Sequence, residues 1–301
     1  MMRYNRAMKK IMVCGLCNIE TSCAVREFPI AYSPIDYNFN GITTMPSGVG
    51  LNLALALTAL GDRVTLLSYA GGDTAGRMLR DTVTGSVHEP VLLDCDATPQ
   101  SVVLYDTDGR RKVFTDLKDM QERRVPFEVF DRYADADAFC LCNINFARDL
   151  LPRAKATSKP IFCDVHCLSD VRDAYNADFM RMSDVLFLSN ESIRDREEEF
   201  VRELAREYPC AIFVVGMGEK GALLYERASD SFYLSPAVYT RPVVNTVGAG
   251  DALFSAFVHF YLSGRSAKEA LDLSCRFASY KIGESGASRG FLSEAELLQY
   301  Q

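Results

Sequence analysis

The sequence predicts an α/β fold: a doubly wound, mainly parallel central sheet with helices on both faces. The prediction depends on two observations. Helical segments alternate with short strands from about residue 126 onward, and those strands are apolar along nearly their whole length. Strands of this kind are buried on both faces, as in a parallel sheet between two layers of helices. The predicted strands of this region are 138–142, 160–163, 185–188 and 211–215, and its clearest helices are 147–156 and 192–207.

The two ends of the chain also read as strands and helices. No repeat, linker or low-complexity segment divides the chain, so we expect a single domain over residues 1–301. Asp108-Gly109 is typical of the tight turn of a β-hairpin. The N-terminal part is predicted to form strands at 10–14, 62–68, 87–93, 101–105 and 111–115, a helix that ends at Leu60 and another that begins within 71–76. The C-terminal part is predicted to form helices at 252–262, 267–282 and 293–299.

Composition excludes several classes of function. The chain has 301 residues, of which 48% are hydrophobic and 24% charged, as in ordinary globular proteins. A net charge of −7 argues against a nucleic-acid partner, which requires a basic surface. No apolar run approaches the roughly 20 residues that cross a membrane, and the run after the basic N-terminus is too short for a signal peptide. We therefore expect a cytoplasmic protein without nucleic-acid or membrane partners.

Ten cysteines raise the alternative of a metal or redox site. Cys14 and Cys17 form a C-x-x-C pair, and Cys163 and Cys167 are four residues apart. Neither pair has a second C-x-x-C at zinc-finger spacing, and the chain has only three histidines. Most of these cysteines lie in apolar runs, where cysteine behaves as a small core residue. Reduced, buried thiols are the simpler interpretation.

A glycine-rich turn near the C-terminus carries the clearest chemical signal. Gly248, Ala249 and Gly250 follow an apolar strand-like segment and precede an apolar run that reads as a buried helix. Bare backbone amides at a helix start can bind an anion such as a phosphoryl group. Asp251 then lies in the first helical turn, where a carboxylate can accept the proton of an alcohol. The alternative is a plain strand-to-helix turn whose Asp helps the helix to begin.

This stretch, Asn245-Thr246-Val247-Gly248-Ala249-Gly250-Asp251, resembles the D-T-x-G-A-G-D signature of the ribokinase-like (phosphofructokinase-B type) carbohydrate kinases. The resemblance extends from Gly15 to Ala287. It implies an ATP-dependent phosphotransferase in which Asp251 is the general base, the turn from Gly248 to Gly250 is the anion hole, and Thr246 contacts ATP. It also implies ATP and Mg²⁺ as cofactors, and K⁺ as a cation that many members use. Asn245 replaces the family's Asp, which lies near that monovalent cation.

Two further motifs imply the acceptor site. Asn18 and Glu20 match the family's G-x-x-N-x-D, with a longer acid in place of Asp. Gly48 and Asn52 match G-G-x-x-x-N-x-A, with Ser47 in place of the first Gly. The resemblance implies that these four residues hold sugar hydroxyls, and the longer acid is expected to shift substrate preference. Without the family, they would read as a solvated strand end and a packing or capping Asn.

Three motifs imply the ATP site. Asn190 matches the first residue of the family's N-x-x-E, whereas Ile193 stands where the Glu that holds water on Mg²⁺ is expected. We therefore assign no metal ligand directly. Gly218 and Gly221 match a G-x-K-G turn beside ATP. Residues 216–221 also fit G-x-G-x-x-G, but the segment that follows reads as a strand, whereas a dinucleotide site requires a helix. Residues 285–288 match a G-A turn near the adenine.

The family fold adds a small β-sheet lid, expected at about 20–45 and 95–116. The aromatics of the first segment suit a homodimer interface or a stacking surface for a base. We expect transfer to a hydroxymethyl group of a sugar. The alternatives are a nucleoside kinase of the same fold and a non-catalytic sugar-binding or regulatory relative. A phosphorylated sugar is less favoured because the matched acceptor positions include no Arg or Lys.

Overall fold

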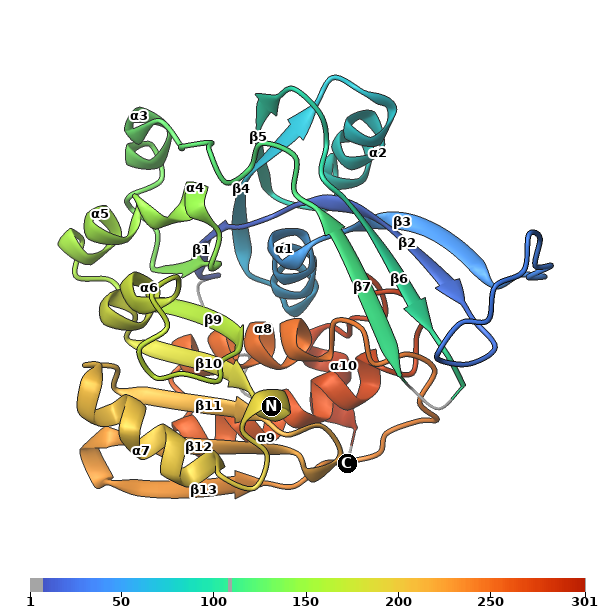
Figure 1. Cartoon of the computed structure of the whole chain (residues 1–301). Coiled ribbons are helices and arrows are strands. Elements are labelled where there is room, and N and C mark those ends of the chain that lie inside the picture. Colours follow the sequence, from blue (N-terminus) through green and yellow to red (C-terminus); the bar gives the residue numbers. More distant parts are fainter. Residues whose placement is uncertain (1–7, 108–109, 301) are drawn as a thin grey trace.

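The computed structural model describes residues 8–107 and 110–300 (Figure 1). The predicted hairpin turn Asp108-Gly109 lies outside these residues. The elements form two sheets, a nine-stranded central sheet and a four-stranded smaller one, with helices packed around the first. The α/β fold class predicted from the sequence is confirmed.

The central sheet has the strand order β13-β12-β11-β10-β9-β8-β1-β4-β5. The strands from β11 to β5 pair in parallel, and β12 and β13 extend the sheet as antiparallel edge strands. The bounds are β1 Lys10–Cys14, β4 Arg63–Gly71, β5 Glu89–Cys95, β8 Ala138–Leu141, β9 Ile161–Cys167, β10 Val185–Ser189, β11 Ile212–Gly216, β12 Ala222–Glu226 and β13 Ser231–Ser235.

Both faces of this sheet are covered by helices because the strands are apolar on both sides. In β1, Ile11 and Val13 face one hydrophobic core, whereas Met12 and Cys14 face the other. The first core is completed by α1 (Val49–Leu60), α2 (Thr74–Val83), α8 (Ala249–Leu262), α9 (Ala267–Lys281) and α10 (Glu294–Gln299). The second is completed by α3 (Phe127–Asp131), α4 (Asn145–Arg148), α5 (Leu151–Ala156), α6 (Ala177–Met182) and α7 (Glu197–Glu207).

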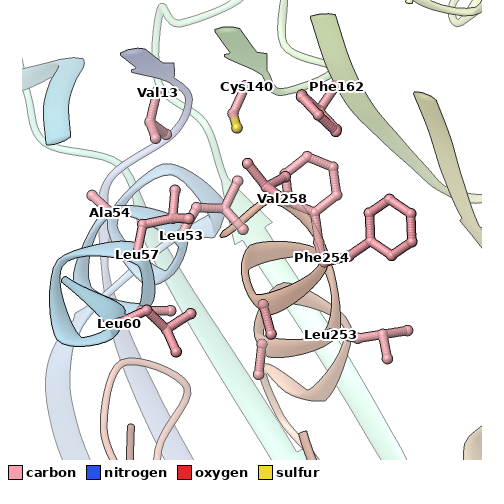
Figure 2. Close-up of a cluster of buried hydrophobic side chains, with 14 of the residues drawn as sticks. Val13, Leu53, Ala54, Leu57, Leu60, Cys140, Phe162, Leu253, Phe254 and Val258 are labelled. Carbon is pink, nitrogen blue, oxygen red and sulfur yellow. The ribbon is translucent and has the colours of Figure 1, made fainter. Parts of the chain in front are cut away.

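Helices α1 and α8 pack side by side on the first face (Figure 2). Leu53 and Leu57 of α1 meet Val258 of α8 beneath Val13 and Cys140 of the sheet. Their apolar sides are fully buried, so the two helices are held in a fixed relation. The first turns of α1 and α8 therefore bring together residues that are about two hundred positions apart in sequence.

The smaller sheet has the order β3-β2-β6-β7, with bounds Asn18–Ala24 for β2, Ile42–Ser47 for β3, Gln100–Tyr105 for β6 and Arg111–Asp116 for β7. Strands β2 and β6 are parallel, and the two outer strands pair antiparallel with them. Residues 25–41 form no helix or strand, and Tyr32, Tyr37 and Phe39 are exposed. Figure 1 shows this sheet projecting away from the central sheet beside α1.

Three details of the sequence prediction were wrong. The helix expected over 147–156 is two short helices, because Pro152 lacks the N–H that a continuous helix would need and instead lies in the first turn of α5. The helix expected over 192–207 begins only at Glu197, after a 3₁₀ turn (Asn190–Ser192) and Asp195 in a left-handed conformation (φ 65°). Strand β13 was not predicted.

The cysteines follow the simpler interpretation. All ten are free, and all but Cys23 and Cys167 are buried. Burial raises the pKa of the Cys17 thiol to about 12, so this member of the C-x-x-C pair is protonated at neutral pH. Across residues 8–107 and 110–300, no group of three or more His, Cys, Asp or Glu could hold a metal ion. None of the helices in that part of the chain is long and apolar enough to span a bilayer.

Candidate active site

The candidate site lies at the carboxyl ends of the parallel strands. Strand β1 is the third strand from the β5 edge of the sheet, with β4 and β5 on one side and β8 on the other. The chain order reverses there, and ligands of open α/β sheets bind at such a switch point. The segment after β1 leads directly to Asn18 and Glu20 on β2. The acceptor residues predicted from the sequence therefore begin at the expected edge of the sheet.

Asp251 and Asn52 meet at this edge. Asn52 lies in α1 and donates from Nδ2 to Oδ2 of Asp251, in the first turn of α8, over 2.6 Å. The other oxygen of Asp251, Oδ1, makes no hydrogen bond to any described residue. Burial raises the pKa of Asp251 above its usual value, and the bond from Asn52 opposes that rise. The result is a carboxylate held at one oxygen and available as a base at the other.

The turn before α8 uses some of its amides internally. The N–H of Val247 donates to Oδ1 of Asn245 over 2.8 Å. The N–H of Ala249 donates to the carbonyl of Thr246 over 3.2 Å. Of the three residues predicted from the sequence to form the anion hole, Ala249 therefore already has its amide engaged.

Other amides of the turn are available. Gly248 adopts the left-handed conformation (φ 78°), and a Cβ there would lie 2.8 Å from the carbonyl oxygen of Ala287. Only glycine fits this position without moving the backbone. The N–H groups of Gly248, Gly250 and Asp251 have no hydrogen-bond partner among the described residues. A Cβ on Gly250 would meet no atom within 4 Å, so there is open space beside these amides.

The predicted acceptor residues form a second group. Asn18 donates from Nδ2 to Ser101 Oγ of β6 over 2.9 Å. Ser47 donates to Glu20 Oε2 over 3.3 Å across the β2–β3 pair. Burial raises the pKa of Glu20, and the bond from Ser47 opposes that rise. These contacts fix the side chains from neighbouring strands of the smaller sheet.

Two buried oxygens of this group are left without partners. Asn18 Oδ1 and Asn52 Oδ1 are buried, and neither has a hydrogen-bond partner within the described part of the chain. An unpaired buried acceptor costs about 1–3 kcal/mol. A ligand that brings hydroxyl donors to both oxygens would recover that cost. Gly48 (φ 103°) belongs to the tight turn here, where a Cβ would lie 2.5 Å from the carbonyl oxygen of Leu16.

The residues predicted to bind ATP lie farther along the same edge of the sheet, at the carboxyl ends of the parallel strands. Asn190 follows β10, and Gly218 and Gly221 form the turn between β11 and β12. Gly221 has a φ of 98°, and a Cβ there would lie 2.1 Å from the carbonyl oxygen of Ser235. Thr246 is exposed in the turn before α8. The structure therefore distributes these four residues over three neighbouring loops.

A residue that the sequence motif did not indicate contacts Asn190. Ile193 is buried in the second core and presents no polar group. Asn190 Nδ2 instead donates to Glu197 Oε1 over 2.8 Å, from the first turn of α7. The left-handed Asp195 delays the helix, so the acid appears four positions later than the motif expects. Glu191 pairs with Arg111 of β7 over 3.2 Å.

The sequence reasoning also missed Asp164 and His166 at the end of β9. His166 has a φ of 56°, and its Nδ1 lies 3.5 Å from Asp164 Oδ2. Burial opposes protonation of His166, but the charge of Asp164, its hydrogen bond and the charge of Asp251 together raise the pKa of His166 to about 9. The resulting positive charge opposes the rise that burial causes in the pKa of Asp251. Polar residues directly after a buried strand were the signal that could have identified this pair.

Mg²⁺ does not require a dedicated protein cage, because it is usually bound through substrate phosphates, water and one or two carboxylates. Asp164 of β9 and Glu197 in the first turn of α7, which bonds Asn190 directly after β10, supply carboxylates. Burial raises the pKa of Asp164, but the charge of His166 and the hydrogen bonds from its side chain and backbone together hold that pKa below its usual value, so this carboxylate is ionised. Carboxylate oxygens are ligands of the kind that Mg²⁺ takes when it arrives with a nucleotide.

Comparisons with known proteins agree with this arrangement. Residues 8–294 match the model of the pfkB family of carbohydrate kinases. An acarbose 7(IV)-phosphotransferase from Actinoplanes sp. is 22% identical over 292 residues, which cover 96% of this chain and 97% of the relative. A nucleoside kinase from Methanothermobacter thermautotrophicus is 25% identical over 267 residues, which cover 84% and 83% of the two chains.

Solved structures have the same fold. A microbiome-derived acarbose kinase superposes with a TM-score of 0.87 at 22% identity, over 98% of this chain and 99% of that one. Arabidopsis thaliana ribokinase, solved with ribose and ATP, superposes with a TM-score of 0.82 at 17% identity, again over 98% and 99% of the two chains.

Proposed function

The chain belongs to the pfkB family of carbohydrate kinases and is a sugar or nucleoside kinase, and from that membership we propose that it transfers the γ-phosphoryl group of ATP to a hydroxymethyl group of a sugar. The observation that carries the proposal is the contact between Asn52 and Asp251 beside the available amides of Gly248 and Gly250. It combines a positioned base with an anion site at one helix start.

In this proposal Asp251 Oδ1 accepts the proton of the acceptor CH₂OH. The acceptor oxygen forms a bond to the γ-phosphorus, and the bond from that phosphorus to the leaving ADP oxygen breaks. The amides of Gly248, Gly250 and Asp251 receive the charge on the transferred group. The raised pKa of Asp251 suits this role, because a more basic carboxylate takes up a proton more readily. Asn52 keeps the carboxylate oriented throughout.

The unpaired oxygens of Asn18 and Asn52 support a polyhydroxylated acceptor. Two buried acceptors match two hydroxyl donors of one ligand, and sites built in this way reject analogues that lack those hydroxyls. Glu20 adds a third acceptor beside them. The relatives named for acarbose, together with ribokinase, are consistent with a carbohydrate acceptor.

We assign the nucleotide to the loops that carry Asn190, Gly218, Gly221 and Thr246. Mg²⁺, when bound with ATP, would neutralise phosphate charge. Asp164 and Glu197 would hold the ion and its water, and His166 would add positive charge next to the phosphates. Within the described residues no larger ligand set exists, so the ion is expected to bind with the nucleotide rather than to the protein alone.

The experiment is a measurement of ADP formation from Mg·ATP with pooled sugars, oligosaccharides, nucleosides and sugar phosphates. Asp251→Asn is run beside the wild type, and Asp94→Asn, whose side chain is 94% exposed, serves as the matched control. We expect turnover with a sugar pool that falls by about 10²–10⁴-fold in Asp251→Asn and is unchanged in the control. Full activity in Asp251→Asn would exclude it as the base.

A nucleoside acceptor is the second candidate, because the nucleoside kinase relative is 25% identical over most of its length. Stacking on a base would require an aromatic at the acceptor site. Three aromatics of the segment between β2 and β3, Tyr32, Tyr37 and Phe39, are 94%, 75% and 85% exposed in this structure. Turnover with the nucleoside pool alone would establish this candidate in place of the sugar kinase.

A further inference from the structure

Lys281 is a buried charge that the proposed chemistry does not yet use. It is the last residue of α9, and its exposed fraction is 0%. Lysine is almost never fully buried unless it is paired, because taking an ammonium group out of water is costly. A buried lysine beside a candidate active site therefore requires a specific explanation.

The contact made by Lys281 is to the phosphoryl-binding turn. Its Nζ donates to the backbone carbonyl of Val247, the residue directly before Gly248. In a continuing helix that carbonyl would accept from the N–H of Asp251. Lys281 bonds this carbonyl, and the Asp251 amide, which lies in the first turn of α8, has no partner among the described residues. The ammonium thus holds the turn beside an amide that is available for a ligand.

The same end of α9 fixes the turn at two further points. The N–H groups of Val244 and Asn245 both donate to the carbonyl of Ile282, over 2.8 and 3.0 Å. The backbone on each side of Thr246 is therefore anchored to one short segment. Of these anchors, only the bond from Lys281 brings a charge.

We propose that Lys281 is the resident cation of this site: its buried ammonium fixes the Val247 carbonyl and so holds the amides of Gly248, Gly250 and Asp251 in the orientation that receives the γ-phosphoryl group. The proposal rests on the proposed function, and it makes Lys281 a positioning residue. It also explains why Asn245, which is uncharged, can stand at the start of the turn. The positive charge is covalently attached, so we expect turnover without added K⁺.

Burial and the neighbouring charges set the pH at which Lys281 loses its proton. Burial lowers the pKa of Lys281 to about 8, although Asp251 of α8, Glu20 of β2 and Glu284 raise it, and Arg241 lowers it further. Lys281 is therefore an ammonium at neutral pH and loses its proton as the pH rises through about 8. Above that pH the Val247 carbonyl loses its charged donor. Affinity for the γ-phosphoryl group should fall on the alkaline side.

The test compares Lys281→Met, Lys281→Arg and the control Lys268→Met, an exposed lysine of the same helix. The primary readout needs no turnover: the dissociation constants of the ATP analogue AMP-PNP and of ADP, each with Mg²⁺, measured by calorimetry from pH 6.5 to 9.5. We expect Lys281→Met to weaken AMP-PNP by about 10-fold or more, as for a lost charged hydrogen bond, and to leave ADP binding nearly unchanged. Wild-type AMP-PNP affinity should fall above pH 8, and Lys281→Arg should remove that fall.

Two further measurements complete the experiment. Thermal melting of each variant shows whether it is folded, and Lys281→Arg, which retains the charge, serves as the second variant if Lys281→Met is unstable. Wild-type kcat is compared in KCl and in choline chloride. Equal AMP-PNP to ADP affinity ratios in wild type and Lys281→Met, or a wild-type requirement for K⁺, would overturn the proposal. Absence of turnover with every acceptor pool would instead overturn the proposed function, while the binding data would still decide the role of Lys281.

Discussion

Replacing Gly250 by alanine should separate the stability of this protein from its chemistry. Gly250 lies in the first turn of α8 with a φ outside the left-handed region, and a Cβ at this position would meet no atom within 4 Å. Alanine therefore costs nothing sterically in the free protein, and it gains about 0.5–1 kcal/mol over glycine within a helix. For a chain of this size we expect Tm to stay the same or to rise by roughly 2 °C.

The same methyl group would occupy the space beside the amides of Gly250 and Asp251. If these amides receive the transferred phosphoryl group, the methyl group keeps it from reaching them. Loss of a single donor of this kind costs about 10²–10³-fold in kcat. We therefore expect Gly250→Ala to be as stable as the wild type and to have kcat lower by about two orders of magnitude.

Two other glycines provide the comparison. Gly72 is exposed, has a φ outside the left-handed region, and a Cβ at this position would also meet no atom within 4 Å, so Gly72→Ala should change neither Tm nor kcat. Gly248→Ala should lower both, because its φ is 78° and a Cβ would lie 2.8 Å from a backbone oxygen. The assay pairs thermal melting with ADP release using the acceptor found in the pooled screen. Undiminished kcat in Gly250→Ala would refute the assignment of these amides to the phosphoryl group.

Two further changes test the neighbouring contacts. Asn52→Leu removes the 2.6 Å bond that lowers the pKa of Asp251, so the acidic limb of the kcat–pH profile should move to higher pH. An acidic limb at the same pH as in the wild type would contradict this. Glu197→Gln should weaken activation by Mg²⁺ about 10-fold or more, as is typical when a group that orients a metal site is changed. Titration of activity with Mg²⁺ checks it, and Glu198→Gln, the exposed neighbour, should behave as wild type.

The fold could be predicted from the sequence because the local pattern of each segment agrees with the strand or helix that it forms. The short run at 10–14, apolar after Lys10, is typical of a buried strand, and the pattern of strand and helix from residue 126 leaves few topologies other than a parallel sheet. The errors were local. Pro152 and the left-handed Asp195 change where helices begin, and neither effect disturbs the apolar periodicity from which the helices were predicted.

The part of the candidate site whose residues are adjacent in sequence could be predicted. Residues that are distant in sequence and come together only in the folded chain could not. The turn from Gly248 to Asp251 is contiguous, so its amides and carboxylate could be inferred together. Lys281 lies thirty residues beyond Asp251, at the end of a helix that reads as ordinary amphipathic structure. Nothing in its local sequence indicates that it is fully buried, because that depends on how α9 packs against the turn.

Residues that depart from the family motifs form hydrogen bonds within the candidate site. Ser47 stands where a glycine was expected, and it donates to Glu20, which is one methylene longer than the expected acid. Because Ser47 and Glu20 are hydrogen-bonded across one strand pair, the two departures form a single change in the acceptor site.

The same relation holds on the phosphate side of the site. Asn245 lacks the charge of the expected Asp but still binds the Val247 amide, while Lys281 binds the Val247 carbonyl. Each of the two peptide groups that flank Val247 is therefore bonded to a side chain, which restricts rotation of the backbone at this residue. The turn before α8 is therefore fixed in advance of ligand binding, which favours an anion site that requires no reorganisation when charge develops on the transferred group.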